Sequence, residues 1–164
     1  MIIVVMGVSG SGKTTVGQEL ARQLGWGFVD GDDLHSAANI AAMSQGIPLD
    51  DEDRRGWLQA IGSLIRQTNQ EGKSLVIACS ALKQSYRQGL QGSQIEWVYL
   101  RGSPEQIQAR LSQRQGHFWD PSLLDSQFEA LQEPDQALVL DISDRPEVLV
   151  DKICQGLGLR DPAG

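Results

Sequence analysis

The chain is short of cysteine, of positive charge and of long apolar runs. Its 164 residues include two cysteines, Cys79 and Cys154. They are too few and too far apart for a disulfide framework or a zinc site, so we expect reduced thiols. A formal net charge of −7 argues against nucleic-acid and anionic-membrane partners, because both attract basic surfaces. No apolar run approaches the roughly 18 residues of a membrane span, and the strand-like stretch from Ile2 leaves no room for a signal peptide. These absences favour a cytoplasmic protein.

What is present suffices for one hydrophobic core. A length of 164 residues with 40% apolar content predicts a single domain over residues 1–164, without linker, repeat or low-complexity tract. Short apolar runs alternate with segments of helical periodicity, and Pro104 and Pro146 stand where helices can begin. The predicted strands are Ile2–Met6, Gly27–Asp30, Ser74–Cys79, Ile95–Leu100 and Ala137–Asp141. This alternation predicts an α/β fold, a three-layer sandwich with a five-stranded parallel sheet covered on both faces.

The most specific motif is the run Gly-Val-Ser-Gly-Ser-Gly-Lys-Thr from Gly7 to Thr14, which fits the phosphate-loop (P-loop) pattern in full. An apolar stretch precedes it and a helical pattern follows, so strand, loop and helix occur in the required order. The glycines let backbone N–H groups turn toward phosphate oxygens, and the helix N-terminus adds partial positive charge. The motif predicts a site for a nucleoside triphosphate. Its nucleotide-binding residues are Gly7, Val8, Ser9, Gly10, Ser11, Gly12, Lys13, Thr14 and Thr15.

Carboxylates follow the second predicted strand, where ligands of a parallel sheet gather. We expect Asp30 and Thr14 to hold Mg²⁺, because P-loop enzymes need a carboxylate for the metal. Asp32 is placed to position or deprotonate an incoming hydroxyl. The sequence Asp-Gly-Asp-Asp also suits a turn and a helix cap. Asp141, after the last predicted strand, competes with Asp30 for the metal, and we rank Asp30 first.

Two arginines mark a predicted lid. Arg110 and Arg114 are four residues apart, so on one helix they share a face. Gly116 is a candidate helix stop, and residues of about 110–120 then form a mobile segment that closes over ATP and brings arginine to the transferred phosphoryl group. The alternative is a surface helix with two solvated arginines. The predicted catalytic residues are Lys13, Asp32 and Arg114.

Several blocks together resemble the gluconokinase family, over residues 2 to about 155. They are Met6–Lys13, Asp30–His35, Gly46–Arg54 with Trp57-Leu58, Cys79–Lys83 with Tyr86-Arg87, Gly116–Phe118, and Leu124–Phe128 with Leu131. The resemblance implies a P-loop kinase that uses ATP and Mg²⁺. Its reaction transfers the γ-phosphoryl group of ATP to the 6-hydroxyl of D-gluconate, giving 6-phospho-D-gluconate. The resemblance also implies a homodimer.

The resemblance further implies an acceptor site that suits gluconate chemistry. A sugar acid needs cations for its carboxylate and hydrogen-bond partners for its hydroxyls. The implied substrate-binding residues are Asp32, His35, Arg54, Lys83, Arg87 and Gln127, with Arg54 and Arg87 as the leading carboxylate ligands. Taken singly, His35 also fits an exposed capping turn, and Arg54, Lys83 and Arg87 also fit solvated helix charges.

The expected mechanism is direct in-line phosphoryl transfer without a covalent enzyme intermediate, in which positioning and cation placement matter most. Two alternatives remain at this point. One is another small-molecule kinase on the same scaffold, similar to shikimate kinase. The other is a nucleotide-dependent switch or ATPase that works through a protein partner and needs no small acceptor. A panel of acceptors separates these readings.

Overall fold

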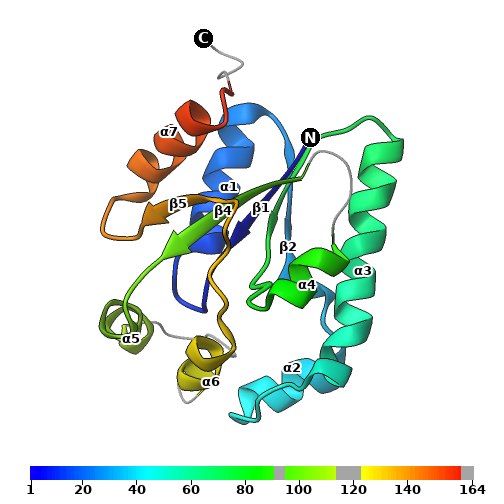
Figure 1. Ribbon diagram of the computed structural model, residues 1–164, viewed down its shortest axis with the longest axis vertical. Helices are drawn as coiled ribbons and strands as arrows, with labels where there is room; N and C mark the ends of the chain where they lie inside the picture. The colour runs from blue at the N-terminus through cyan, green and yellow to red at the C-terminus, as the bar shows by residue number, and fades with distance from the viewer. Residues whose placement is uncertain (91–94, 114–122, 160–164) are drawn as a thin grey trace.

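Five parallel strands of the described residues form the centre of the molecule, in the order β2-β3-β1-β4-β5 (Figure 1). The computed structural model describes residues 1–90, 95–113 and 123–159. The strands are β1 (Ile2–Met6), β2 (Gly27–Asp30), β3 (Leu75–Ala78), β4 (Ile95–Arg101) and β5 (Leu138–Asp141). The predicted α/β fold with a five-stranded parallel sheet is confirmed, and every predicted strand end lies within one residue of the observed end.

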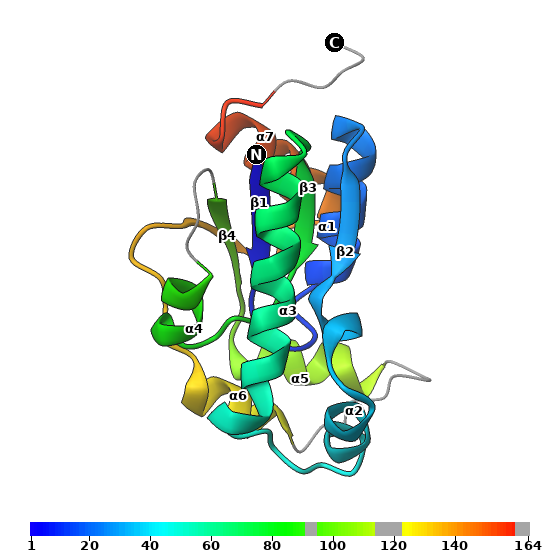
Figure 2. The same ribbon diagram turned by 90° about the vertical axis from the view of Figure 1, so that its right-hand side faces the viewer.

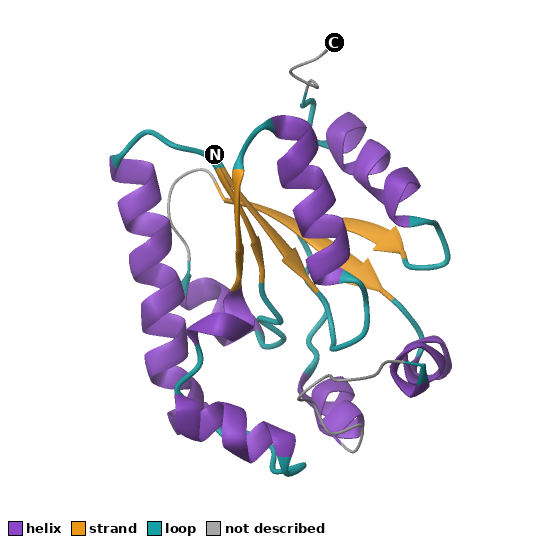
Figure 3. Ribbon diagram, turned by 180° about the vertical axis from the view of Figure 1, so that it is seen from behind, coloured by secondary structure: helices purple, strands orange, loops and turns teal. Residues whose placement is uncertain are grey.

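Helices cover both faces of the sheet (Figures 1 and 2). On one face lie α1 (Lys13–Leu24) and α7 (Pro146–Gly156), and on the other lie α3 (Asp51–Gln70) and α4 (Gln84–Gly89). The remaining helices are α2 (Ala37–Ser44), α5 (Pro104–Ser112) and α6 (Leu123–Ala130), with a short 3₁₀ turn, η1 (Gly31–Leu34). The strand arrows point toward the end of the molecule where α2, α5 and α6 lie (Figure 3). That end gathers the polar residues that follow the strands.

β1 is buried along its whole length because it lies in the middle of the sheet. Ile3 and Val5 contribute to the hydrophobic core beneath α1 and α7, and Ile2 and Val4 to the core beneath α3. All four side chains are fully buried. A strand covered on both faces needs apolar residues at every position, which explains the continuous apolar run before the phosphate loop.

α3 is the longest helix of the described residues, at 20 residues. It begins with a capping box: the Asp50 side chain accepts from the Asp53 backbone N–H, and the Asp53 side chain accepts from the Asp50 N–H. Its buried Trp57 and Ile61 face the sheet. The cap fixes the first turn of α3, which carries Arg54 toward the carboxyl ends of the strands. Within the described ranges, none of the helices has the length and apolar character to cross a membrane.

Candidate active site

The loop between β1 and α1 forms an anion cradle. Gly10 and Gly12 have φ of 82° and 97°, backbone conformations that side chains disfavour. α1 begins after Gly12 without a side-chain cap, which leaves its first-turn N–H groups for an anion. The ammonium group of Lys13 donates to the carbonyl oxygen of Val8 at 2.9 Å, so the side chain folds back over the loop. The cradle has the geometry that the motif predicts.

The end of β2 meets the first turn of α1. Thr14 Oγ1 donates to Asp30 Oδ2 at 2.8 Å, and Asp30 Oδ1 accepts from the backbone N–H of Asp32 at 3.0 Å. A hydroxyl and a carboxylate beside a phosphate cradle fit Mg²⁺, which binds through a few protein oxygens and through substrate phosphates. No cluster of three or more His, Cys, Asp or Glu side chains that could hold a metal occurs among the described residues. The Thr14 hydroxyl and the Asp30 carboxylate are oxygen donors of the kind that bind a metal together with nucleotide phosphates.

Asp32 lies half-buried in η1, one residue beyond Gly31. Burial, followed by the negative charge of Asp32, raises the pKa of the nearby Cys79 thiol to about 12. Cys79 is therefore a neutral thiol at pH 7, and Cys154 is also free of any disulfide. Cys79 is buried and Cys154 is half-buried. Asp32 stands at the carboxyl end of the strands, next to the Asp30 carboxylate that it helps to orient.

Three of the predicted acceptor residues line one cavity, on the side of the sheet where α3 and α4 pack. They are His35, Arg54 and Gln127. The rest of the lining consists of Met43, Leu49, Trp57, Ser80, Leu82, Tyr86 and Ala130. The cavity measures about 20 Å³, roughly the space of one water molecule. These side chains therefore form only part of a site for a whole sugar acid.

His35 is held as a neutral hydrogen-bonding ring. It is buried and stacks on Trp57, with ring centroids 4.4 Å apart and planes 12° from parallel. Trp57 Nε1 in turn donates to the Gly31 carbonyl at 2.7 Å. Burial, followed by the charge of Arg54, lowers the pKa of His35 to about 4. The amide nitrogen of Asn39 lies 3.4 Å from Nδ1, so we assign the proton to Nε2. The ring can then donate to a hydroxyl oxygen through Nε2.

Four polar side chains join the first turn of α3 to α4, and we call them the Tyr86 cluster: Asp51, Arg54, Lys83 and Tyr86. Arg54 Nη1 donates to the Tyr86 hydroxyl at 3.2 Å, and that hydroxyl donates to Asp51 Oδ1. Lys83 Nζ donates to the same Asp51 oxygen at 2.8 Å. The Arg54 guanidinium carbon and Lys83 Nζ lie 5.7 and 5.5 Å from the Tyr86 ring centroid, within range of cation–π attraction. Hydrogen bonds from Lys83 and then Tyr86 lower the pKa of Asp51.

Sequence reasoning gave Asp51 no role and used Tyr86 only as part of a motif. The one signal in the sequence is weak. Lys83 and Tyr86 are three residues apart, which is a spacing of neighbours on a helix, but nothing in the sequence links either to the start of α3.

Arg87 does not join Arg54 in the cavity lining. Its guanidinium donates to three backbone carbonyls, those of Ala81 at 2.9 Å, Leu82 at 3.0 Å and Gln132 at 2.6 Å. Ala81 has φ of 33°, a left-handed conformation that costs energy in a residue other than glycine. The buried Arg87 therefore holds the strained turn after β3 and ties it to the segment after α6.

Gln127 contacts the phosphate loop as well as the cavity. Its Oε1 accepts from the backbone N–H of Ser9 at 2.6 Å. Gln127 is 4% exposed and Ser9 is 7% exposed, so this hydrogen bond is shielded from water. A single side chain of α6 thus connects the cradle to the cavity that holds His35 and Arg54.

Arg110 lies against the phosphate loop from the other side. Its guanidinium donates to the Ser11 carbonyl at 3.3 Å and to the Ile142 carbonyl. α5 ends at Ser112 with Gln113 as its C-cap. Arg114, and the predicted lid from residue 114 onward, lie outside the described residues.

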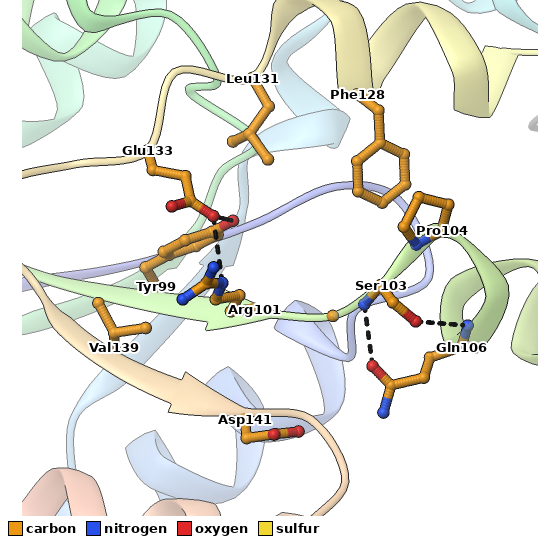
Figure 4. Close-up of a pocket in the computed structure, with 11 residues that line it drawn as sticks. Tyr99, Arg101, Ser103, Pro104, Gln106, Phe128, Leu131, Glu133, Val139 and Asp141 are labelled. Atoms are coloured by element: carbon orange, nitrogen blue, oxygen red, sulfur yellow. Dashed lines mark hydrogen bonds and ion pairs between the residues drawn. The ribbon is translucent and has the colours of Figure 1, made fainter.

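A larger hollow of about 580 Å³ lies over β4 and β5 (Figure 4). Glu133 Oε1 accepts from the Tyr99 hydroxyl at 3.3 Å and pairs with Arg101 Nε at 3.2 Å. Burial, followed by Glu133, raises the pKa of Tyr99 to about 12. Asp141 lines this hollow, on the edge strand, and accepts from the Ser143 N–H at 2.8 Å. None of the predicted nucleotide or acceptor residues lines this hollow, so we do not assign it as the active site although it is the larger of the two. Of the two candidate metal ligands, Asp30 and not Asp141 bonds to Thr14.

Comparison with known proteins shows the family to which the chain is similar. A family model described as shikimate kinase matches residues 9–154. A gluconokinase from Gluconobacter oxydans (strain 621H) is 43% identical over 164 residues, covering 97% of this chain and 92% of the relative. The thermoresistant gluconokinase of Escherichia coli (strain K12) is 45% identical over 158 residues, covering 95% and 86%. The crystal structure of a gluconokinase from Sinorhizobium meliloti 1021 superimposes with a TM-score of 0.85 at 41% identity, covering 95% and 90%.

Proposed function

The chain belongs to the shikimate kinase family and, within it, to the gluconokinases, and we propose that it phosphorylates D-gluconate. The reaction transfers the γ-phosphoryl group of ATP to the 6-hydroxyl, giving 6-phospho-D-gluconate and ADP. The observation that carries the proposal is the Gln127 side chain, which bonds to Ser9 in the phosphate cradle and lines the cavity with Arg54 and His35. Donor and acceptor groups therefore meet at one place.

On the nucleotide side, we propose that the loop N–H groups and Lys13 bind the β- and γ-phosphates. The uncapped start of α1 supports this role. Thr14 and Asp30 would hold Mg²⁺, which when bound neutralises charge on the phosphates. Arg110, already in contact with the loop carbonyl of Ser11, borders the same nucleotide. Thr15, in the first turn of α1, and Arg114 are the remaining proposed nucleotide-binding residues. Arg114 is also proposed to stabilise the transferred phosphoryl group.

On the acceptor side, Arg54 is the proposed partner of the gluconate carboxylate, since guanidinium binds carboxylate through parallel N–H groups. His35 donates from Nε2 to a hydroxyl, and Gln127 adds an amide. Asp32 accepts a hydrogen bond from the attacking 6-hydroxyl and takes its proton as the phosphoryl group arrives. Lys83 is a further proposed substrate-binding residue, and in the Tyr86 cluster its ammonium group donates to Asp51. Arg87 was predicted as a second carboxylate ligand, but its contacts support holding the turn after β3.

The proposal includes a single kinase domain, a homodimer and a cytoplasmic location. All described strands share one sheet, which supports a single domain. The homodimer follows from the family resemblance, and light scattering on the purified protein tests it. The cytoplasm supplies the ATP that the reaction consumes.

The test is ADP release from Mg-ATP with D-gluconate, run beside shikimate, other sugar acids and no acceptor. We expect ADP release that depends on gluconate, with 6-phospho-D-gluconate as the product. ADP release with shikimate and with no other acceptor would show that the protein phosphorylates shikimate and not gluconate. Equal release with and without every acceptor would favour an ATPase or a nucleotide-dependent switch.

A further inference from the structure

We propose that Tyr86 and Asp51 are positioning residues that hold Arg54 in the orientation that binds the acceptor carboxylate. The inference rests on the proposed function, because it concerns the same acceptor. It assigns a role to two side chains that do not themselves need to touch the substrate. Their effect on the reaction passes through Arg54.

The phenol of Tyr86 is set up to accept from Arg54. A tyrosine hydroxyl has one proton and can accept hydrogen bonds on its oxygen. The proton goes to Asp51 Oδ1, so a lone pair of the oxygen is left to face Arg54 Nη1 at 3.2 Å. The Asp51 carboxylate therefore fixes the direction of the Tyr86 O–H bond. The phenol oxygen in turn fixes the orientation of the Arg54 guanidinium. Tyr86 is 6% exposed, which limits competition from water.

Asp51, the partner of the Tyr86 hydroxyl, and Lys83, the partner of the Asp51 carboxylate, stand at helix starts. Asp51 is the first residue of α3 and lies between Asp50 and Asp53, the two members of the capping box that fixes this turn. Lys83, the N-cap residue of α4, donates to the same oxygen of the Asp51 carboxylate that accepts from Tyr86. Arginine has a long side chain with high rotamer entropy, and a partner that limits its freedom before binding lowers the entropic cost of binding.

The choice of a neutral phenol has an electrostatic consequence. A carboxylate bonded directly to Arg54 would orient the guanidinium but would also offset its positive charge and weaken its attraction for the acceptor carboxylate. In the Tyr86 cluster the carboxylate of Asp51 bonds directly to Lys83, whereas Arg54 bonds to the uncharged phenol. The two cations and one anion leave a net charge of +1 on the cluster, and this matches an acceptor with a single carboxylate.

The experiment measures steady-state kinetics of Tyr86→Phe and Asp51→Asn, with Tyr99→Phe as the matched control. Tyr99 and Tyr86 are the two tyrosines of the chain, and the Tyr99 hydroxyl bonds to Glu133 in the hollow over β4 and β5 (Figure 4). We expect Tyr86→Phe to raise KM for gluconate about ten-fold, since hydrogen bonds to charged groups are the strong ones. Asp51→Asn should shift it in the same direction. KM for ATP and kcat should stay within about two-fold of the parent. The lost contact stabilises bound gluconate equally in the ground state and the transition state, so its loss raises KM and leaves kcat unchanged. Tyr99→Phe should leave all three values unchanged.

A double-mutant cycle with Arg54→Met separates positioning from a general structural effect. If Tyr86 acts through Arg54, Tyr86→Phe should change kcat/KM for gluconate by less than about two-fold once Arg54 is replaced. An equal loss in both backgrounds, or an unchanged gluconate KM in Tyr86→Phe and Asp51→Asn, would overturn the positioning role and leave the proposed function intact. A parent enzyme without gluconate-dependent ADP release would overturn both. Thermal unfolding of each variant shows that the fold is kept.

Discussion

Replacing Gln127 with leucine tests whether α6 holds the phosphate loop. Leucine is close to glutamine in size but has no acceptor, so Gln127→Leu leaves the Ser9 N–H without the partner at 2.6 Å. Both residues are buried, so water does not readily replace the lost oxygen. An unsatisfied buried donor costs about 1–3 kcal/mol. For a protein of this length that corresponds to a fall in Tm of roughly 2–12 °C.

The assay is calorimetric unfolding with and without ATP, together with KM for ATP. Gln132→Leu is the control, because the Gln132 side chain also accepts from a backbone N–H, that of Gln84 at 2.7 Å, but at an exposed site. We expect the control to lose much less stability, since water can replace its oxygen. The Gln127 variant should also show a raised KM for ATP, because the loop N–H groups are less well ordered. An equal fall in Tm for both variants, with KM for ATP unchanged, would refute the reasoning.

Three further changes give independent tests. Lys13→Ala should lower kcat about a hundred-fold or more in the ADP assay, because it removes the mobile cation at the phosphates, and a kcat near that of the parent would contradict the nucleotide site. Burial lowers the pKa of His35 from 6.5 to about 4, so below pH 6.5 the unfolded chain binds a proton that the folded chain does not. Stability measured in urea should therefore fall between pH 6.5 and 4, by up to about 3 kcal/mol from this residue, and His35→Gln should flatten the fall; an equal slope in both proteins would exclude the effect. In α1, a methyl group on Gly17 would lie 2.7 Å from Phe28 Cε2, so Gly17→Ala should destabilise by about 1–3 kcal/mol. Gly56 in α3 has nothing within 4 Å, so Gly56→Ala should stabilise by about 0.5–1 kcal/mol, and the same sign for both would refute the packing argument.

The sheet and the phosphate loop were predictable because their signals are local. A strand buried on both faces needs a continuous apolar run, and Ile2–Met6 is such a run. The cradle needs glycine where φ is positive, and Gly10 and Gly12 stand at those positions. Proline at the first turn marked the starts of α5 and α7 correctly. Each of these features depends on neighbours in the sequence.

The site was less predictable because its contacts join distant segments. The sequence showed a cation at Arg87, but the carbonyls that it binds belong to a turn after β3 and a loop after α6. The sequence showed a cation at Arg110, but the carbonyls that it binds belong to Ser11 in the phosphate loop and Ile142 after β5. The Tyr86 hydroxyl bonds to Arg54 and Asp51 because α4 packs against the first turn of α3. Tertiary packing decides such contacts, and a local pattern does not record them.

The strand order separates two kinds of evolutionary change. The phosphate loop follows β1 at the centre of the sheet, whereas the proposed acceptor residues His35 and Arg54 and the positioning residue Tyr86 come from segments that follow β2 and β3, to one side of β1. Substitutions in those segments can alter which alcohol is phosphorylated and leave the inherited nucleotide chemistry of β1 and α1 untouched. Gln127 is the exception, because it bonds to the phosphate loop and also lines the cavity with His35 and Arg54. A lineage that acquires a new acceptor is therefore expected to diversify first around residues 35–54 and 80–86, and last at Gln127.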